Sequence, residues 1–135
     1  MTAYTITLVD TARLNPTEQV EAARVDDLVR ELASDGCQRL PILVERESLA
    51  ILDGHHRYRA AQALGLARIA AVVIAYDDPR LTLASWTAQT FTHDDVLTAA
   101  RSGHLLPQKS TRHVLNPAMP EISVPLHELR ETALA

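Results

Sequence analysis

An uninterrupted apolar stretch from Ile69 to Ala75 is the feature that most restricts the fold of this chain. It has the length of a β-strand and contains no polar residue that would face water. Strands that are apolar along their whole length are buried on both faces, as the central strands of covered sheets are. We therefore expect residues 69–75 to form a buried central strand.

Other strands and helices are expected on both sides of this stretch. Polar and apolar alternation predicts strands at 5–9 and 81–86, and two apolar runs separated by a charged turn predict short strands at 41–44 and 48–52. Helical spacing followed by glycine predicts helices at 22–35 and 55–64. Thr92 and Asp95 have the spacing of a capping box that opens a further helix, which Gly103 ends. From His104 onward we expect loops, with a short strand near 122–124 and a last helical turn near 126–130. This mixture predicts an α+β fold, with residues 1–135 forming one compact domain in which helices flank a small mixed sheet.

The composition argues against several classes of protein. With 13 Lys and Arg against 17 Asp and Glu, the formal net charge of −4 argues against a broad basic face that binds DNA. Cys37 is the only cysteine, which excludes an internal disulfide and a cysteine-rich zinc site. No apolar run approaches the roughly 20 residues that span a bilayer, and the first residues do not resemble a signal peptide. We therefore expect a cytoplasmic protein without a membrane partner, and the oligomeric state stays open.

The segment from 51 to 61 carries the densest set of groups suited to binding phosphate. A predicted strand leads through Gly54 directly into a helix, so free backbone N–H groups point outward at the positive end of the helix dipole. Three side-chain donors stand at the same end: His55, His56 and Arg57. The Arg57 guanidinium can hold a phosphate through two parallel hydrogen bonds, and Asp53 can bind a Mg²⁺ ion that bridges phosphate oxygens. The alternative is an ordinary helix start, with Asp53 as its N-cap and solvated basic side chains behind it.

The run Asp53-Gly54-His55-His56-Arg57-Tyr58-Arg59-Ala60-Ala61, preceded by Leu40-Pro41-Ile42-Leu43-Val44, resembles the nucleotide-binding core of the ParB/sulfiredoxin-like fold. DNA-partitioning proteins, sulfiredoxins and free-serine kinases share that core. Sulfiredoxins carry their catalytic cysteine directly after the glycine, where this chain has His55, and Cys37 lies elsewhere. Partition proteins continue into a helix-turn-helix region and a dimerisation domain, for which we expect 135 residues to be too few.

Features outside the shared core resemble the free-serine kinases. The segment from 103 to 113 is similar to one of theirs that ends in Lys-x-Thr-Arg-His and lines the amino-acid pocket, and Trp86 resembles a tryptophan of that pocket. Glu21-Ala22-Ala23-Arg24 resembles the Glu-x-x-Arg that opens their first helix, where the glutamate is the catalytic base. The resemblance thus implies an amino-acid pocket made by four residues: Trp86, Lys109, Thr111 and His113. The last three alternate along an extended segment, which predicts that their side chains share one face with Trp86 as a wall, while Arg112 points the other way.

These features together predict a kinase that transfers a phosphoryl group from ATP or ADP to the hydroxyl of free L-serine and gives O-phospho-L-serine. In this hypothesis Glu21 accepts the hydroxyl proton, Asp53 and Glu21 hold Mg²⁺, and the segment from Gly54 to Arg57 holds the phosphates, with Arg24 and Arg112 as additional site residues. A non-catalytic ParB-like module that binds CTP or DNA is one alternative. A kinase of the same design that acts on another small hydroxyl compound is a second. The Lys-x-Thr-Arg-His segment favours a kinase, because a switch module does not need it.

Overall fold

A mixed four-stranded sheet forms the centre of the molecule in the computed structural model, which describes residues 4–131. Its strands follow the order β1-β5-β3-β4: β1 (Ile6–Asp10), β5 (Arg68–Ile74), β3 (Ile42–Glu45) and β4 (Ile51–Asp53). The strand β5 pairs antiparallel with β1 and parallel with β3, and β3 pairs antiparallel with β4. The predicted central strand is therefore confirmed, one residue earlier than the apolar stretch, and the fold is α+β as expected.

Successive residues of the sheet enter two separate hydrophobic clusters, as expected for a sheet covered on both faces. Ile42 shares a cluster with Tyr58, which belongs to the helix α2 (His55–Ala63). Its neighbour Leu43 shares the other cluster with Val96, which belongs to the helix α3 (His93–Ser102). This alternation explains why the central strands contain almost no polar residue.

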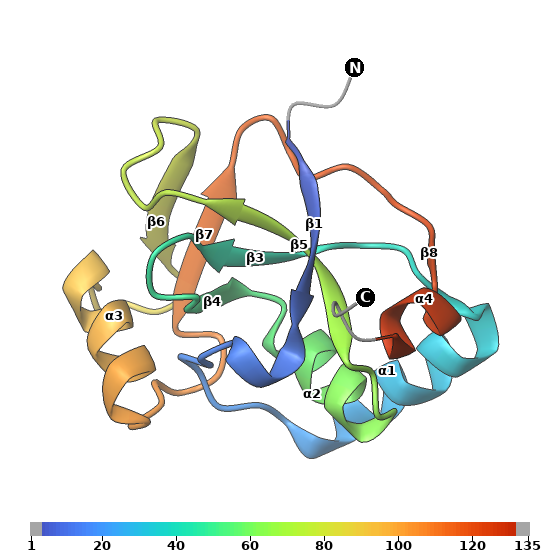
Figure 1. Ribbon diagram of the computed structural model, residues 1–135. Helices are drawn as coiled ribbons and strands as arrows, with labels where there is room; N and C mark the ends of the chain where they lie inside the picture. Colours follow the sequence, from blue (N-terminus) through green and yellow to red (C-terminus); the bar gives the residue numbers. More distant parts are fainter. Residues whose placement is uncertain (1–3, 132–135) are drawn as a thin grey trace.

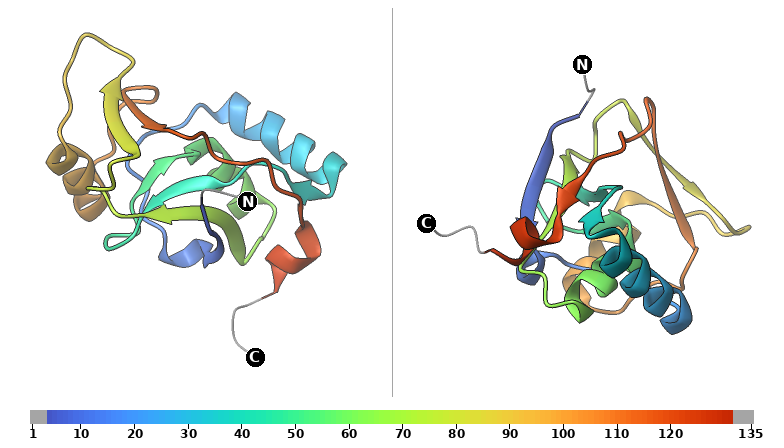
Figure 2. Two further views of the ribbon diagram at one scale, coloured as in Figure 1. Left: turned by 90° about the horizontal axis from the view of Figure 1, so that it is seen from above. Right: turned by 90° about the vertical axis from the view of Figure 1, so that its right-hand side faces the viewer.

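The helices gather at two ends of the sheet (Figures 1 and 2). At one end lie α1 (Ala22–Asp35), α2 and α4 (Leu126–Arg130), and at the other α3 lies beside the strand β6 (Leu81–Ser85). The bounds of α1 match the prediction, and Gly36 ends it with φ 71°. A 3-10 helix (Thr11–Arg13) follows β1, and the short strands β2 (Cys37–Gln38) and β8 (Val124–Pro125) pair with each other. Within residues 4–131 no helix has the length and apolar character needed to cross a membrane.

The capping box predicted at the start of α3 is present. The Asp95 amide donates to Thr92 Oγ1 at 3.1 Å, and the Thr92 amide donates to Asp95 Oδ2 at 2.9 Å. These two bonds satisfy donors that would otherwise lack a partner at the helix end. They fix the first residue of α3, His93, whose ring stacks on Tyr76, two residues after β5, with 3.8 Å between the ring centres.

The strand predicted at 48–52 is shorter than expected, because the side chain of Glu45 stabilises a turn before it. The buried carboxylate of Glu45 accepts hydrogen bonds from the amides of Glu47 and Ser48 and from the Ser48 hydroxyl. Leu49 then adopts φ 56°, so β4 begins only at Ile51. Glu45 thus uses its carboxylate within the turn and leaves Asp53 at the end of β4.

The loops expected after His104 contain a strand that the sequence did not predict. This strand, β7 (Thr111–Leu115), pairs antiparallel with β6 along its full length, from Leu81 opposite Leu115 to Ser85 opposite Thr111. It was missed because its polar residues suggested an unpaired extended segment. Residues 86–110, which include α3, connect the two strands of this β6–β7 sheet. It lies beside the central sheet, where β7 contacts β4 (Figure 1).

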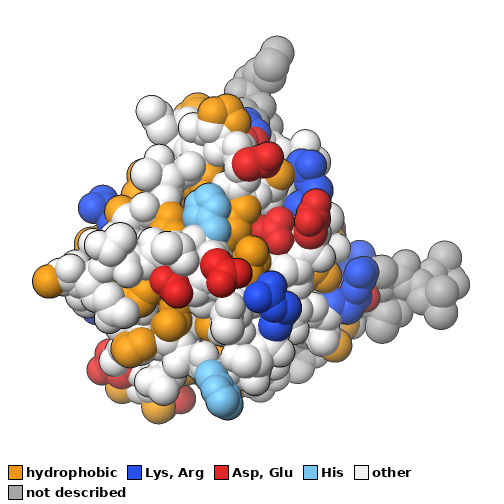
Figure 3. Space-filling model, turned by 90° about the vertical axis from the view of Figure 1, so that its left-hand side faces the viewer, with side chains coloured by type: hydrophobic (Ala, Val, Ile, Leu, Met, Phe, Trp, Pro, Cys, Tyr) orange, Lys and Arg blue, Asp and Glu red, His pale blue; other side chains and the backbone are white. Residues whose placement is uncertain are grey.

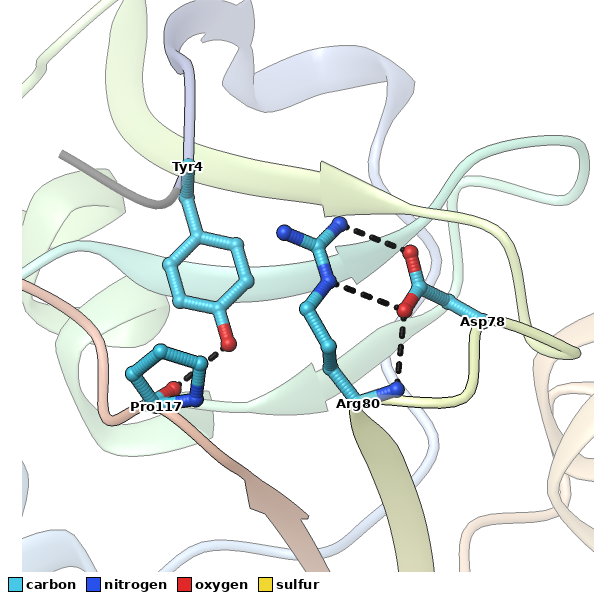
Figure 4. A network of polar contacts seen from close by, with 4 residues as sticks. All are labelled: Tyr4, Asp78, Arg80 and Pro117. Carbon is cyan, nitrogen blue, oxygen red and sulfur yellow. Dashed lines mark hydrogen bonds and ion pairs between the residues drawn. The ribbon is translucent and has the colours of Figure 1, made fainter.

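A polar network links Tyr4, just before β1, to the end of the β6–β7 sheet at which Leu81 pairs with Leu115 (Figure 4). The Tyr4 hydroxyl donates to the Pro117 carbonyl at 2.5 Å, and the Arg80 guanidinium lies 4.6 Å from the centre of the Tyr4 ring. Arg80 also donates to both carboxylate oxygens of Asp78, at 3.0 and 2.8 Å. This end of the β6–β7 sheet is therefore held in place by its contacts with Tyr4.

Candidate active site

A cavity of about 510 Å³ lies between the start of α2 and the β6–β7 sheet. Most of the residues singled out from the sequence line it: Arg24, Asp53, Gly54, His55, His56, Arg57, Trp86, Lys109, Thr111, Arg112 and His113. Its lining also includes Glu18, which the sequence analysis did not single out, but not the predicted base, Glu21. Sequence positions as far apart as 18 and 113 therefore meet in one cavity.

Gly54 sets the turn from which α2 begins. It has φ 99°, and a Cβ atom built on it would lie 2.5 Å from Ile42 Cγ2. Glycine is thus required both by the backbone angle and by the closeness of β3. The turn brings the N-terminus of α2, where free N–H groups favour anions, to the cavity.

Asp53 and Arg57 form the charged pair of this turn. Burial raises the pKa of the Asp53 carboxyl, although the nearby Arg57 opposes the shift and the carboxyl keeps contact with solvent. Burial likewise lowers the pKa of Arg57, with Asp53 and Glu31 opposing, and a guanidinium remains charged under such a shift. The cavity therefore holds a carboxylate and a cation side by side next to the helix N-terminus.

The two histidines of the turn face the segment from Thr17 to Glu21. His55 Nε2 accepts from the amides of Thr17 and Glu18 at 3.1 and 3.2 Å, and His56 Nε2 accepts from the Glu21 amide at 3.0 Å. Burial lowers the pKa of His55 to about 3 and also lowers that of His56. The structure thus directs these acceptor nitrogens to protein amides, where the sequence suggested phosphate ligands.

Glu18 is the functional candidate that sequence reasoning missed. Its carboxylate accepts from the Thr111 hydroxyl at 2.5 Å and from the Ser110 amide at 3.3 Å. Only 7% of the residue is exposed, and burial raises the pKa of the carboxyl while these hydrogen bonds oppose the rise. No local pattern around position 18 suggests this, because its bonding partners lie more than 90 residues further along the chain.

Glu21 stands at the N-cap position of α1 and is exposed, and its side chain makes no capping hydrogen bond. It lies close enough to His56 to favour the protonated ring. The Glu-x-x-Arg segment thus places Arg24 in the cavity lining and Glu21 outside it.

The strand β7 presents Thr111 and His113 on one face, as the alternation predicted, but Thr111 Oγ1 and His113 Nε2 already have protein partners. The Thr111 hydroxyl donates to Glu18, and His113 Nε2 lies 2.7 Å from the Tyr76 hydroxyl. Burial lowers the pKa of His113 to about 4 and raises that of Tyr76, so the phenol donates to a neutral ring. Lys109 departs from the predicted alternation, because it precedes the strand in a turn with φ 53° and is exposed.

Trp86 lines the same cavity as Thr111 and His113, and its ring packs against Arg112. Its ring lies 4.6 Å from the guanidinium of Arg112, and 60% of the residue is exposed. Arg112 follows the alternation of β7 and points away from Thr111, as predicted. The cation–π pair of Trp86 and Arg112 thus occupies an exposed part of the cavity lining.

A comparison with sequence families decides the affiliation of the chain. The profile described as the ParB N-terminal domain matches residues 2–88, more than half of the sequence. The chain belongs to the ParB N-terminal domain family. This match covers β1 to β6, including the turn at Gly54, and ends before β7.

Two curated relatives of this ParB N-terminal domain come from archaea. A ParB-like protein of Sulfolobus acidocaldarius is 36% identical over 86 residues, which are 64% of this chain and 43% of that protein. An ATP-dependent L-serine kinase of Staphylothermus marinus is 32% identical over 83 residues, which are 58% of this chain and 33% of that protein. The matches therefore span less than half the length of these relatives.

Solved structures with the same fold cover more of the chain than the family profile does. A free serine kinase in complex with AMP gives a TM-score of 0.84 at 16% identity, covering 93% of this chain and 94% of that one. SbnI with a C-terminal truncation, from Staphylococcus aureus, gives 0.82 at 14% identity, covering 93% and 89%. At these identities the comparison establishes the fold, and it confirms the expected ParB/sulfiredoxin-like architecture.

Proposed function

We propose that this protein is a nucleotide-dependent kinase that phosphorylates the hydroxyl of free L-serine. The observation that carries the proposal is the composition of the 510 Å³ cavity, in which a helix N-terminus and several cations meet two carboxylates. Phosphoryl transfer to an alcohol needs these parts, because cations stabilise the phosphates while a carboxylate orients the attacking hydroxyl. The names of the relatives, free serine kinase and ATP-dependent L-serine kinase, support L-serine as acceptor and ATP as donor, and solved free serine kinases with AMP or ADP bound support an adenine nucleotide, ATP or ADP, in this role.

The phosphates would bind at the start of α2. Its free N–H groups favour an anion, and the guanidinium of Arg57 lines the same part of the cavity. Arg24 and Lys109 add positive charge from α1 and from the turn before β7. These residues replace the histidines of the sequence-based hypothesis as the phosphate-binding cations.

Asp53 fits a Mg²⁺ ion at this site. Mg²⁺ is commonly held by one or two carboxylates together with substrate phosphates and water. Among residues 4–131 no group of three or more His, Cys, Asp or Glu residues forms a cage for a metal, which agrees with so sparse a protein contribution. Asp53 would hold the ion, whose charge would offset that of the phosphates, whereas Glu21, the second ligand that the sequence suggested, lies outside the cavity lining.

We place the catalytic base at Glu18 in preference to Glu21. Glu18 lines the cavity, is buried and has a raised pKa, which brings a carboxyl closer to the proton affinity that a general base needs. Glu21 is exposed and does not line the cavity. In the proposed step the serine oxygen forms a bond to the terminal phosphorus, the bond from that phosphorus to the bridging oxygen breaks, and the hydroxyl proton passes to Glu18.

Lys109 is the residue best suited to receive the serine carboxylate. Its ammonium belongs to a cavity-lining side chain, whereas Thr111 and His113 already use polar atoms in bonds to Glu18 and Tyr76. The exposed Trp86 can still cover a bound amino acid from the side of the β6–β7 sheet. This arrangement keeps the predicted substrate residues at the cavity but divides their roles between contact and support.

The direct test is the incubation of purified protein with Mg²⁺, L-serine and either ATP or ADP, with detection of O-phospho-L-serine by mass spectrometry. We expect product with at least one nucleotide, and none with either would overturn the proposal. Glu18→Gln should abolish turnover, while Glu21→Gln as the matched variant should retain part of it. The reverse ranking would return the base to Glu21. Threonine and homoserine as acceptors distinguish L-serine from other small hydroxyl compounds.

A ParB-like nucleotide switch is the second candidate, favoured by the family match and by the ParB-like relative. It predicts binding of CTP or DNA without product, and no effect of Lys109→Ala. On the face drawn in Figure 3, acidic and basic side chains of the described residues are interspersed and form no continuous basic surface. Binding to DNA depends largely on phosphate contacts, so this face offers it little support.

A further inference from the structure

The two histidines at the start of α2 act as hydrogen-bond acceptors toward the Thr17–Glu21 segment. Two backbone amides, of Thr17 and Glu18, point at His55 Nε2 from 3.1 and 3.2 Å, and the Thr17 hydroxyl lies 3.0 Å from the same nitrogen. The Glu21 amide points at His56 Nε2 from 3.0 Å. A ring nitrogen that carries a proton cannot accept, so the geometry requires the proton of each neutral ring on Nδ1.

We propose that His55 and His56 are positioning residues that hold the Thr17–Glu21 segment, and with it Glu18, against the start of α2, and that they do not bind phosphate as cations. The three amide donors require an unprotonated Nε2 on each ring, which a cationic ring does not have. The pair thus supplies structure where the motif suggested charge.

The consequence for Glu18 follows from how it is held. Its amide is fixed to His55, and its carboxylate is fixed to β7 through Thr111 and Ser110. Thr17 adds a third attachment, because its hydroxyl donates to the Ile51 carbonyl at 2.8 Å. Loss of the histidine acceptors would leave the segment attached to β4, to β7 and, through backbone hydrogen bonds, to Leu106, but would remove its hydrogen bonds to α2. Misplacement of a catalytic group by about 1 Å can lower the rate about 100-fold.

The first experiment reads the histidine tautomers and requires no enzymatic activity. Two-bond ¹H–¹⁵N correlation spectra of the ¹⁵N-labelled protein at neutral pH distinguish a protonated from an unprotonated ring nitrogen. We expect His55 and His56 to be neutral with the proton on Nδ1, before and after addition of Mg²⁺ and ADP. A protonated Nε2 in the free protein, or a cationic ring once ADP is added, would overturn the inference.

The second experiment separates positioning from phosphate binding through matched variants. His56 is chosen because it is only partly buried and accepts a single hydrogen bond, so its replacement should leave the protein folded. His56→Gln keeps an acceptor near the position of Nε2, whereas His56→Leu removes it. We expect His56→Leu to shift the amide resonance of Glu21 and to lower kcat about 10-fold to 100-fold, and His56→Gln to restore most of both.

Binding of ADP, measured by titration calorimetry, provides the contrast with a phosphate ligand. Arg57→Gln should weaken ADP binding by about tenfold or more, whereas His56→Leu should change it by less than about twofold. Weakening of ADP binding by His56→Leu to the same extent as by Arg57→Gln would refute the positioning role. The kinetic arm rests on the proposed function, but the tautomers and the ADP affinities do not. Absence of all turnover would therefore count against the kinase and leave these two measurements to decide the role of the histidines.

Discussion

Replacing Gly54 by alanine tests the physical account of the turn at the start of α2. Two costs add at this position. A non-glycine residue in left-handed backbone loses about 1–2 kcal/mol, and forcing a methyl group into a packed site costs about 1–3 kcal/mol. The second cost applies because the new Cβ would lie 2.5 Å from Ile42 Cγ2 and 2.9 Å from Ile42 Cβ, on a strand in the middle of the sheet. Reduced freedom of the unfolded chain returns about 0.4–1 kcal/mol, so we expect a net loss of about 1–4.5 kcal/mol.

Gly65→Ala is the matched control for Gly54→Ala. Gly65 has φ 70°, but a methyl group placed on it would have no heavy atom within 4 Å beyond its chain neighbours, so only the backbone cost applies. Its expected loss is about 1 kcal/mol. Urea unfolding followed by circular dichroism should show a midpoint that falls by roughly 1 M more for Gly54→Ala, since the slope is about 1–3 kcal/mol per M. Equal losses for the two variants would mean that contact with Ile42 does not explain the glycine.

Three further predictions concern side chains around the cavity and at the end of the β6–β7 sheet near Tyr4. Because burial raises the pKa of Glu18 above its ordinary 4.5, the stability it contributes is present below that value and is lost as pH rises through the raised value. Glu18→Gln should therefore gain stability relative to the unmodified protein between acid and neutral pH in urea titrations, and a constant difference would contradict this. Tyr76→Phe removes the donor to His113 and should cost about 1–3 kcal/mol in thermal unfolding, with no loss if the contact is incidental. Arg80 lowers the pKa of Asp78 to about 2, so its contribution should disappear as pH falls from about 4 to 2, and Asp78→Asn should flatten that part of the stability profile.

The elements that follow from local pattern were predictable from the sequence. The helix at 22–35, the capping box at Thr92 and the central strand all depend on residues within a few positions of one another. Glycine at helix ends was informative for the same reason, because the left-handed backbone at Gly36 and Gly103 is a local requirement. These features fix which segments become helices and strands, and the Asp53-Gly54 motif fixed where the cavity would lie.

The orientation of side chains in the cavity could not be predicted in this way. Three contacts of the cavity join residues that are distant in the sequence: His55 with Thr17, Trp86 with Arg112, and Glu18 with Thr111. A motif states which chemical groups are present, but a histidine ring can donate, accept or carry charge, and only its neighbours decide which. The pairing of β7 with β6 belongs to the same class, since a polar strand is recognised by its partner more readily than by its own composition.

The bond between Glu18 and Thr111 links the chemistry of the cavity to its architecture. Burial of a carboxyl is unfavourable, and here the hydroxyl of Thr111 and the amide of Ser110 offset part of that cost. The same two bonds attach the Thr17–Glu21 segment to the start of β7, so they hold the proposed base at this wall of the cavity. An apolar residue at position 18 would avoid the cost of burial but would leave the Ser110 amide without this acceptor. The carboxyl at this position is therefore only partly compensated for its burial, which agrees with the proposed role of Glu18 as a proton acceptor.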